Sequence, residues 1–195
     1  MKQEVLEAGK LYHLYNRGNN KEAIFFEERN YFYFLSLIKK YLVPIADIYA
    51  YCLLKNHFHL LLRIHDEAKL GEKLIDKIHL AFSNLFNSYT KSINKVRNRT
   101  GSLFQEHMHR ILINEEYYLK QLVVYIHLNP LKHFNIDYKT YPYSSFKTYL
   151  SVGKTNIYRD FILHYFDSID NFEYLHDINK IKFEGIIEVI DNFDN

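Results

Sequence analysis

The stretch IYAYCLLKNHFHLLLRI, residues 48–64, decides the fold that this chain is expected to adopt. Its two apolar halves are separated by Lys55-Asn56, where a tight turn between two strands is expected. The second half starts with alternating side chains and then becomes apolar on both sides, which is typical of a central strand. Residues 48–64 therefore predict a β-hairpin whose second strand lies inside a sheet.

The flanking residues divide into strands and helices by the spacing of their apolar side chains. In chain order, the expected elements around the hairpin are a strand over Leu11–Asn16, a helix over Glu28–Tyr41, a long helix over Gly71–Val96, a strand over Leu103–Ile113, and a helix from Asn114 to Asn129 that Pro130 ends. This order predicts an α+β fold, a ferredoxin-like or RRM-like antiparallel sheet with helices packed on one face.

The length of 195 residues favours one main domain, which we place over residues 1–150. Residues 151–195 are expected to form a C-terminal helical extension of unknown role. No apolar run reaches the roughly 20 residues that span a bilayer, so no membrane association is expected. The single cysteine, Cys52, excludes an internal disulfide framework and fits a cytoplasmic protein.

Positive charge is concentrated in one part of the chain. Between Lys91 and Arg110 there are five Lys or Arg residues and one acidic residue, Glu106, whereas acidic residues outnumber Lys and Arg after Asp160. A basic stretch beside an acidic tail indicates a polyanion site in the body of the domain. A solvated basic loop is the alternative interpretation.

The hairpin also carries the first candidate for chemistry, the pair His57 and His59. Side chains alternate across a strand, so both imidazoles project from one face and Phe58 from the other. Two such imidazoles can converge on one divalent ion. An isolated pair of this kind is weak support for a metal site, because the chain has 11 histidines, including a second pair at His107 and His109.

The second candidate is Tyr125-Ile126-His127-Leu128-Asn129-Pro130. Tyr125 and Asn129 are i,i+4 neighbours at the edge of the expected apolar stripe of their helix. From that position a side chain can reach across to a sheet. Taken alone, the motif also fits a boundary tyrosine and an asparagine at a helix end.

Together these features resemble the REP-associated tyrosine transposases, a branch of the single-tyrosine HUH transposases, where U is a bulky apolar residue. The resemblance covers about 140 residues, and its blocks are YHLYNRGNNKEAIF at 12–25, CLLKNHFHLLL at 52–62, TGSLFQEH at 100–107, YYLKQLVVYIHLNPLK at 117–132 and YPYSSFKTY at 141–149.

The resemblance implies that residues 1–150 are an HUH single-tyrosine transposase domain. His57 and His59 match the metal-binding histidines, Tyr125 matches the nucleophile, and Asn129 falls where related enzymes place a polar third ligand. The implied cofactor is Mg²⁺ or Mn²⁺. The implied activity is cleavage and transfer of single-stranded DNA through a 5′-phosphotyrosine, at hairpin or repeat-associated DNA, by a monomer or homodimer.

Five basic residues are candidates for contacts with DNA phosphates, each with the alternative of an exposed solubilising charge. They are Arg17, Arg97, Arg99, Arg110 and Lys132. Two other functions stay open at this point. One is a non-catalytic single-stranded nucleic-acid-binding domain of the same architecture. The other is a metal-dependent hydrolase that activates water, with Tyr125 in a structural role.

Overall fold

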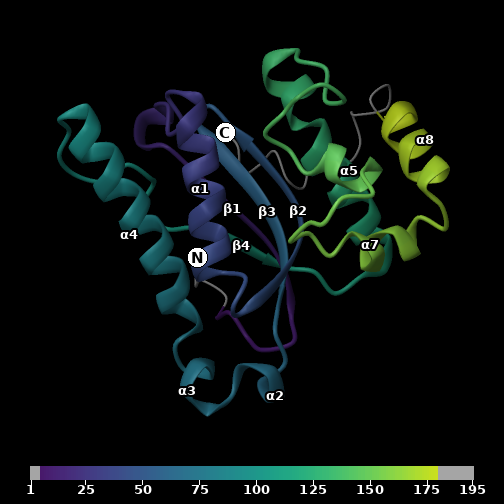
Figure 1. Cartoon of the computed structure of the whole chain (residues 1–195), viewed down its shortest axis with the longest axis horizontal. Helices are drawn as coiled ribbons and strands as arrows, with labels where there is room; N and C mark the ends of the chain where they lie inside the picture. Colours follow the sequence, from purple (N-terminus) through teal and green to yellow (C-terminus); the bar gives the residue numbers. More distant parts are fainter. Residues whose placement is uncertain (1–4, 180–195) are drawn as a thin grey trace.

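The computed structural model of the chain describes residues 5–179. At its centre is a four-stranded antiparallel sheet with the order β2-β3-β1-β4 (Figure 1). The strands are β1 (Leu11–Arg17), β2 (Ala46–Leu54), β3 (His57–Ile64) and β4 (His109–Leu112). The predicted α+β class and the predicted hairpin are confirmed, and β3 is an inner strand as the sequence indicated.

Helices cover both faces of this sheet (Figure 1). They are α1 (Glu28–Tyr41), α2 (Glu67–Leu70), α3 (Glu72–Ile75), α4 (Ile78–Arg97), α5 (Glu116–Phe134), α6 (Phe146–Leu150), α7 (Arg159–Tyr165) and α8 (Ile169–Asn179), with a short 3-10 turn at Asn19–Lys21. In Figure 1, α1 and α4 lie on one side of the sheet, and α5, α7 and α8 lie on the other. The expectation of helices on one face alone is therefore corrected.

The reason for two covered faces lies in the strands themselves. On β3, Phe58, Leu60 and Leu62 belong to the core shared with α1 and α4. Leu61 lies on the opposite side, in a second core shared with α5. A strand that is apolar on both sides exposes hydrophobic surface unless both sides are covered.

Three predicted element boundaries differ from the structure. The long helix predicted over Gly71–Val96 is broken between α3 and α4, where Lys77 has non-helical backbone angles. The strand predicted over Leu103–Ile113 is reduced to β4 and an isolated bridge between Phe104 and Gly18. The remaining difference, in α5, concerns the candidate site directly.

Helix α5 continues through Pro130 to Phe134 and is capped by Asn135 in the left-handed conformation. Proline usually ends a helix because it lacks an N–H group. Here residues 122–130 are all buried between the sheet and the C-terminal helices. This burial stabilises the continuous helix and offsets the lost hydrogen bond. The consequence is that α5 holds Tyr125, Asn129 and Lys132 on one rigid element.

The tyrosine-rich segment after α5 packs against β2. The hydroxyl of Tyr141 donates to the carbonyl of Leu53, and that of Tyr149 to the carbonyl of Tyr49, both at 2.6 Å. Both tyrosines are buried, so this segment packs against the sheet. Within residues 5–179, no helix combines the length and apolarity that crossing a membrane requires.

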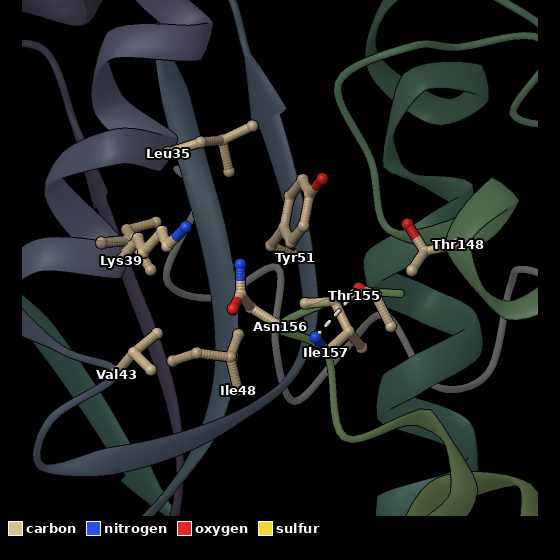
Figure 2. Close-up of a pocket in the computed structure, with 10 residues that line it drawn as sticks. Leu35, Lys39, Val43, Ile48, Tyr51, Thr148, Thr155, Asn156 and Ile157 are labelled. Atoms are coloured by element: carbon tan, nitrogen blue, oxygen red, sulfur yellow. Dashed lines mark hydrogen bonds between the residues drawn. The ribbon is translucent and has the colours of Figure 1, made fainter. Parts of the chain in front are cut away.

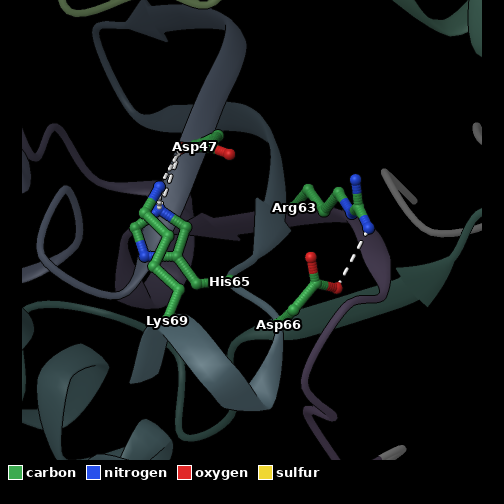
Figure 3. A network of polar contacts seen from close by, with 5 residues as sticks. All are labelled: Asp47, Arg63, His65, Asp66 and Lys69. Carbon is green, nitrogen blue, oxygen red and sulfur yellow. Dashed lines mark hydrogen bonds and ion pairs between the residues drawn. The ribbon is translucent and has the colours of Figure 1, made fainter. Parts of the chain in front are cut away.

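At the end of the sheet away from His57, a polar network joins the strands to α2 (Figure 3). Oδ1 of Asp47 lies 2.8 Å from Nε2 of His65 and 3.2 Å from Nζ of Lys69. Arg63 pairs with Asp66 at 3.1 Å. These contacts close the open end of the hairpin and have no part in the candidate site.

A buried chain of hydrogen bonds ties α8 to α5. Nδ1 of His176 donates to the carbonyl of Phe172 at 2.7 Å, and Nε2 of His176 lies 2.9 Å from Nδ1 of His127. Nε2 of His127 lies 2.8 Å from the hydroxyl of Ser145. Because the carbonyl only accepts, the protons can be placed: His127 donates to His176, and Ser145 donates to His127. Both imidazoles are then neutral.

This chain of neutral histidines predicts a loss of stability in acid. Burial lowers the pKa of His176 to about 4 and that of His127 well below its ordinary value. The unfolded chain takes up these protons near pH 6.5, whereas the folded chain resists them. The stabilisation is therefore fully present above pH 6.5 and is lost as the pH falls toward 4, by roughly 3 kcal/mol for His176 alone.

Urea unfolding at a series of pH values measures this effect. The double variant His127→Leu, His176→Leu removes both titrating groups, and we expect a flatter profile than that of the wild type between pH 6.5 and 4. His164, exposed on α7, provides the control, since His164→Leu should keep the wild-type slope. Equal slopes in the double variant and the wild type would contradict the assignment.

Candidate metal centre and nucleophile

The two predicted metal ligands lie together on the face of β3 that α5 covers. The ring centroids of His57 and His59 are 5.3 Å apart. His57 is 5% exposed and His59 is fully buried. The site is thus enclosed, because α5 lies directly over it.

Each imidazole is held by a hydrogen bond to its Nδ1 atom. Nδ1 of His59 lies 3.1 Å from Nε2 of His13, and Nδ1 of His57 lies 2.7 Å from Oδ1 of Asn56. The Nε2 atoms of both histidines are buried and have no hydrogen-bond partner among the residues that the structure describes. A ring fixed through one nitrogen, with the other nitrogen unused, is the usual arrangement of a metal-binding histidine.

Asn129 supplies a third atom of the same kind. Its Nδ2 donates to the carbonyl of Tyr125 at 2.8 Å, and its Oδ1 is buried with no hydrogen-bond partner in residues 5–179. Within residues 5–179, no three His, Cys, Asp or Glu side chains are grouped so that they could hold a metal ion. A metal site at this histidine pair therefore needs a third ligand of another type. An amide oxygen is such a ligand for Mg²⁺ or Mn²⁺.

The surroundings keep these histidines neutral, as metal binding requires. Burial, together with the smaller effects of the charges of His133, Arg17 and Lys132, lowers the pKa of His57 to about 3. The Asn129 side chain has the opposite, smaller effect, although no hydrogen bond of normal geometry joins it to His57. Burial, followed by the charge of His13, holds the pKa of His59 well below its usual value.

Tyr125 lies beside the histidine pair. Its ring centroid is 5.5 Å from that of His59 and 6.4 Å from that of His13. Nζ of Lys132 lies 5.4 Å from the centre of the Tyr125 ring. Tyr125 is only 2% exposed, so it lies inside the interface between α5 and the sheet and not at its edge. The predicted nucleophile and the predicted ligands are therefore brought together.

Two of the five predicted phosphate-contacting residues lie at this site. Arg17 is paired in register with His57 across β1 and β3, and Lys132 reaches over Tyr125. Arg97 and Arg99 lie at the end of α4, where Arg97 stacks on Phe26 at 4.5 Å.

Arg99 and Arg110 complete the set of predicted phosphate contacts. Arg99 pairs with Glu22 at 3.5 Å. Arg110 is paired with Leu14, whose side chain belongs to the core beneath α1 and α4. Partners in register share a face of the sheet, so the Arg110 side chain lies on the face opposite the histidines.

The structure adds residues to the site that sequence reasoning did not assign. His13 and Tyr15 project from β1 toward the histidine pair, and His133 of α5 lies 4.8 Å from the ring of His57. The signal for His13 and Tyr15 was their alternation along a predicted strand. The signal for His133 was its position four residues after Asn129, which was hidden by the expectation that Pro130 ends the helix.

A separate hollow lies on the other side of the sheet, between α1 and the segment that follows α6 (Figure 2). Its lining includes Leu35, Lys39, Tyr51 and Ile157. Tyr51 and Ile157 pack against the core of α1 and α4. The sheet therefore separates this hollow from the histidine pair.

Comparison with known proteins identifies a solved structure of the same fold. The structure of a REP-associated tyrosine transposase bound to a REP hairpin matches with a TM-score of 0.62, over 81% of this chain and 90% of that one, at 14% identity. No protein-family model and no curated protein matches the chain. The resemblance drawn from the sequence is confirmed at the level of the fold.

Proposed function

We propose that this chain is a metal-dependent endonuclease and strand transferase that acts on single-stranded DNA at hairpin structures. In this proposal Tyr125 is the nucleophile, and His57, His59 and Asn129 hold Mg²⁺ or Mn²⁺. The relative with the same fold is bound to a REP hairpin, which supports hairpin DNA as the substrate class.

One observation carries the proposal. Three buried atoms of metal-ligand type, Nε2 of His57, Nε2 of His59 and Oδ1 of Asn129, have no hydrogen-bond partner among residues 5–179, and His59 and Asn129 both contact Tyr125. A buried polar atom without a partner costs about 1–3 kcal/mol. Three of them at one place are accounted for if a cation binds there.

In the proposed reaction, the Tyr125 hydroxyl oxygen attacks a backbone phosphorus. A new P–O bond to tyrosine forms as the bond from phosphorus to the 3′ oxygen breaks. The phenol gives up its proton to solvent, and the departing 3′ oxygen takes one up. The product is a 5′-phosphotyrosine and a free 3′ hydroxyl. Because the bond energy is conserved, a second 3′ hydroxyl can reverse the step and join a different strand.

The chain's own residues position these groups. The α5 backbone fixes the Tyr125 ring beside His59, so in-line placement compensates for a phenol that is a modest nucleophile near pH 7. Arg17 and Lys132 lie close enough to His57 for both charges to act on it, and there they can bind the phosphate oxygens. A divalent ion bound here would supply charge neutralisation on the phosphate and polarise the 3′ oxygen.

The experiment that tests this function combines nicking with covalent capture. The wild-type protein is incubated with a 3′-end-labelled DNA hairpin that has unpaired flanks, together with MnCl2, because a 5′-phosphotyrosine retains the fragment on the 3′ side of the cut. The proposal predicts a nicked strand and a protein band that keeps the label under denaturing conditions, both lost in EDTA. Nicking without any label on the protein would instead support the hydrolase, and binding without either product the non-catalytic domain.

Removal of the amide ligand should weaken metal binding without abolishing it. We expect Asn129→Ala to reduce Mn²⁺ affinity by roughly tenfold, because the two imidazoles still hold the ion. Asn129→Asp keeps an oxygen in place and should bind Mn²⁺ at least as well as the wild type. Isothermal titration measures both. An unchanged affinity in Asn129→Ala would remove Asn129 from the set of ligands.

The salt dependence of DNA binding should locate the phosphate contacts. Each phosphate contact with single-stranded DNA steepens the fall of the logarithm of the binding constant with the logarithm of the salt concentration by about 0.7. The double variant Arg17→Gln, Lys132→Gln should therefore flatten this slope by roughly 1.4. The triple variant at Arg97, Arg99 and Arg110 tests the contacts that the sequence suggested away from the histidines. If only the triple variant changes the slope, DNA binds at the end of α4 or on the opposite face.

A further inference from the structure

A stack of aromatic rings runs from the histidine pair to the edge of the sheet. The Tyr15 ring lies 5.8 Å from that of His59 and is inclined to it by 28°. On the other side, the His109 ring lies 4.9 Å from that of Tyr15, with only 8° between their planes. Tyr15 is buried, whereas His109 is exposed on the edge strand β4. The stack thus reaches a ring that is exposed at the edge of the sheet.

A small cleft lies where this stack meets the candidate metal centre. Its lining combines the rings of Tyr15, His57 and His109 with Arg17 and Gln105. The side-chain amide of Gln105 makes no hydrogen bond within residues 5–179, although its backbone N–H donates to the carbonyl of Arg17. The cleft therefore offers a flat ring, a positive charge and an amide that can both donate and accept.

We propose that His109 is a stacking surface for one unpaired nucleobase of the DNA substrate, close to the phosphate that Tyr125 attacks. This inference rests on the proposed function and adds a binding subsite to it. The base would continue the stack formed by His59, Tyr15 and His109, and its phosphate would lie toward Arg17 and His57. The amide of Gln105 faces the same cleft and can bind an edge of the base.

The chemistry of the cleft favours an unpaired base over other flat groups. Stacking on an aromatic ring needs an open face, which a base within a duplex does not offer. The neighbouring charge of Arg17 attracts a ligand that carries phosphate. Because Tyr15 is buried against the other rings, it holds His109 parallel to itself before any ligand binds. A preorganised ring lowers the entropy cost of stacking.

The test measures the affinity of a fluorescein-labelled DNA hairpin with unpaired thymidine flanks, in EDTA so that no cleavage occurs. We expect His109→Ala to weaken binding by about tenfold, the size of one base–aromatic stack. His109→Phe keeps a flat ring and should bind nearly as well as the wild type. His107→Ala, a change at an exposed histidine two residues away, is the matched control and should have no effect.

Probes with one flanking thymidine replaced by an abasic nucleotide then locate the base. At one position, the abasic probe should bind the wild type about tenfold more weakly than the intact probe does. The His109→Ala variant should bind these two probes equally well. The inference is overturned if His109→Phe weakens DNA binding as much as His109→Ala does. It is also overturned if the difference in affinity between the wild type and His109→Ala is the same for every abasic probe as for the intact probe.

The inference and the proposed function can fail separately. If an adduct forms on Tyr125 but His109→Ala binds like the wild type, the stacking surface is excluded and the proposed function stands. If His109→Ala shows the expected loss and no adduct forms, the subsite stands and the catalytic proposal fails. If the wild type does not bind the hairpin at all, both are overturned.

Discussion

Tyr125→Phe is expected to abolish nicking and covalent capture of DNA while metal binding and DNA binding remain close to wild type. The substitution removes only the hydroxyl that is proposed to attack phosphorus, and the ring keeps its place beside His59 and Lys132. Loss of a nucleophile costs at least about a thousandfold in rate. Because nothing else in the site changes, the variant should still bind a labelled hairpin and Mn²⁺.

Tyr118, on the same helix, provides the control for this variant. It lies seven residues before Tyr125, nearly two helical turns away, and cannot reach the same phosphate unless α5 moves. Tyr118→Phe should therefore nick and form adducts like the wild type. Full nicking by Tyr125→Phe would mean that water or another residue is the nucleophile, and the assignment of Tyr125 would be wrong.

The second large effect is expected from His57→Ala and His59→Ala, each of which should abolish cleavage. Each variant removes one of two buried imidazoles whose Nε2 atoms have no hydrogen-bond partner in the described part of the chain. Because a bound ligand stabilises the folded state, Mn²⁺ should raise the melting temperature of the wild type. It should raise that of the two variants much less. This thermal measurement does not depend on DNA or on catalysis.

His65 provides the matched control, since it is buried just after the end of β3 and pairs with Asp47 at the far end of the sheet. His65→Ala should lose some stability yet keep both cleavage and the Mn²⁺ effect. If His57→Ala or His59→Ala cleaves DNA at the wild-type rate while EDTA inhibits the wild type, the metal is held elsewhere.

The parts of the site that could be predicted are those set by local periodicity. Alternation along a strand places His57 and His59 on one face whatever surrounds them. Helical spacing likewise places Asn129 one turn after Tyr125. Both pairings are present in the structure, and the strand pairing of Arg17 with His57 brings a predicted basic residue to them.

The parts that could not be predicted depend on packing between distant segments. Tyr125 was expected at the edge of a buried stripe, but its ring lies in the interface between α5 and the sheet, where His59 and His13 are its neighbours. The same packing lets α5 continue past Pro130 and bring His133 to His57. The place of Arg110 depends on its register with Leu14, which a single strand considered alone cannot reveal.

The most direct test of the proposed chemistry is to identify the residue that carries DNA after reaction. The wild type is incubated with the hairpin and MnCl2, denatured and digested, and the peptides are mapped by mass spectrometry. We expect a single modified peptide, from the centre of α5, with a nucleotide 5′ phosphate attached to Tyr125. A nucleotide on any other residue, or nicked DNA with every peptide unmodified, would contradict the assignment of Tyr125 as the nucleophile.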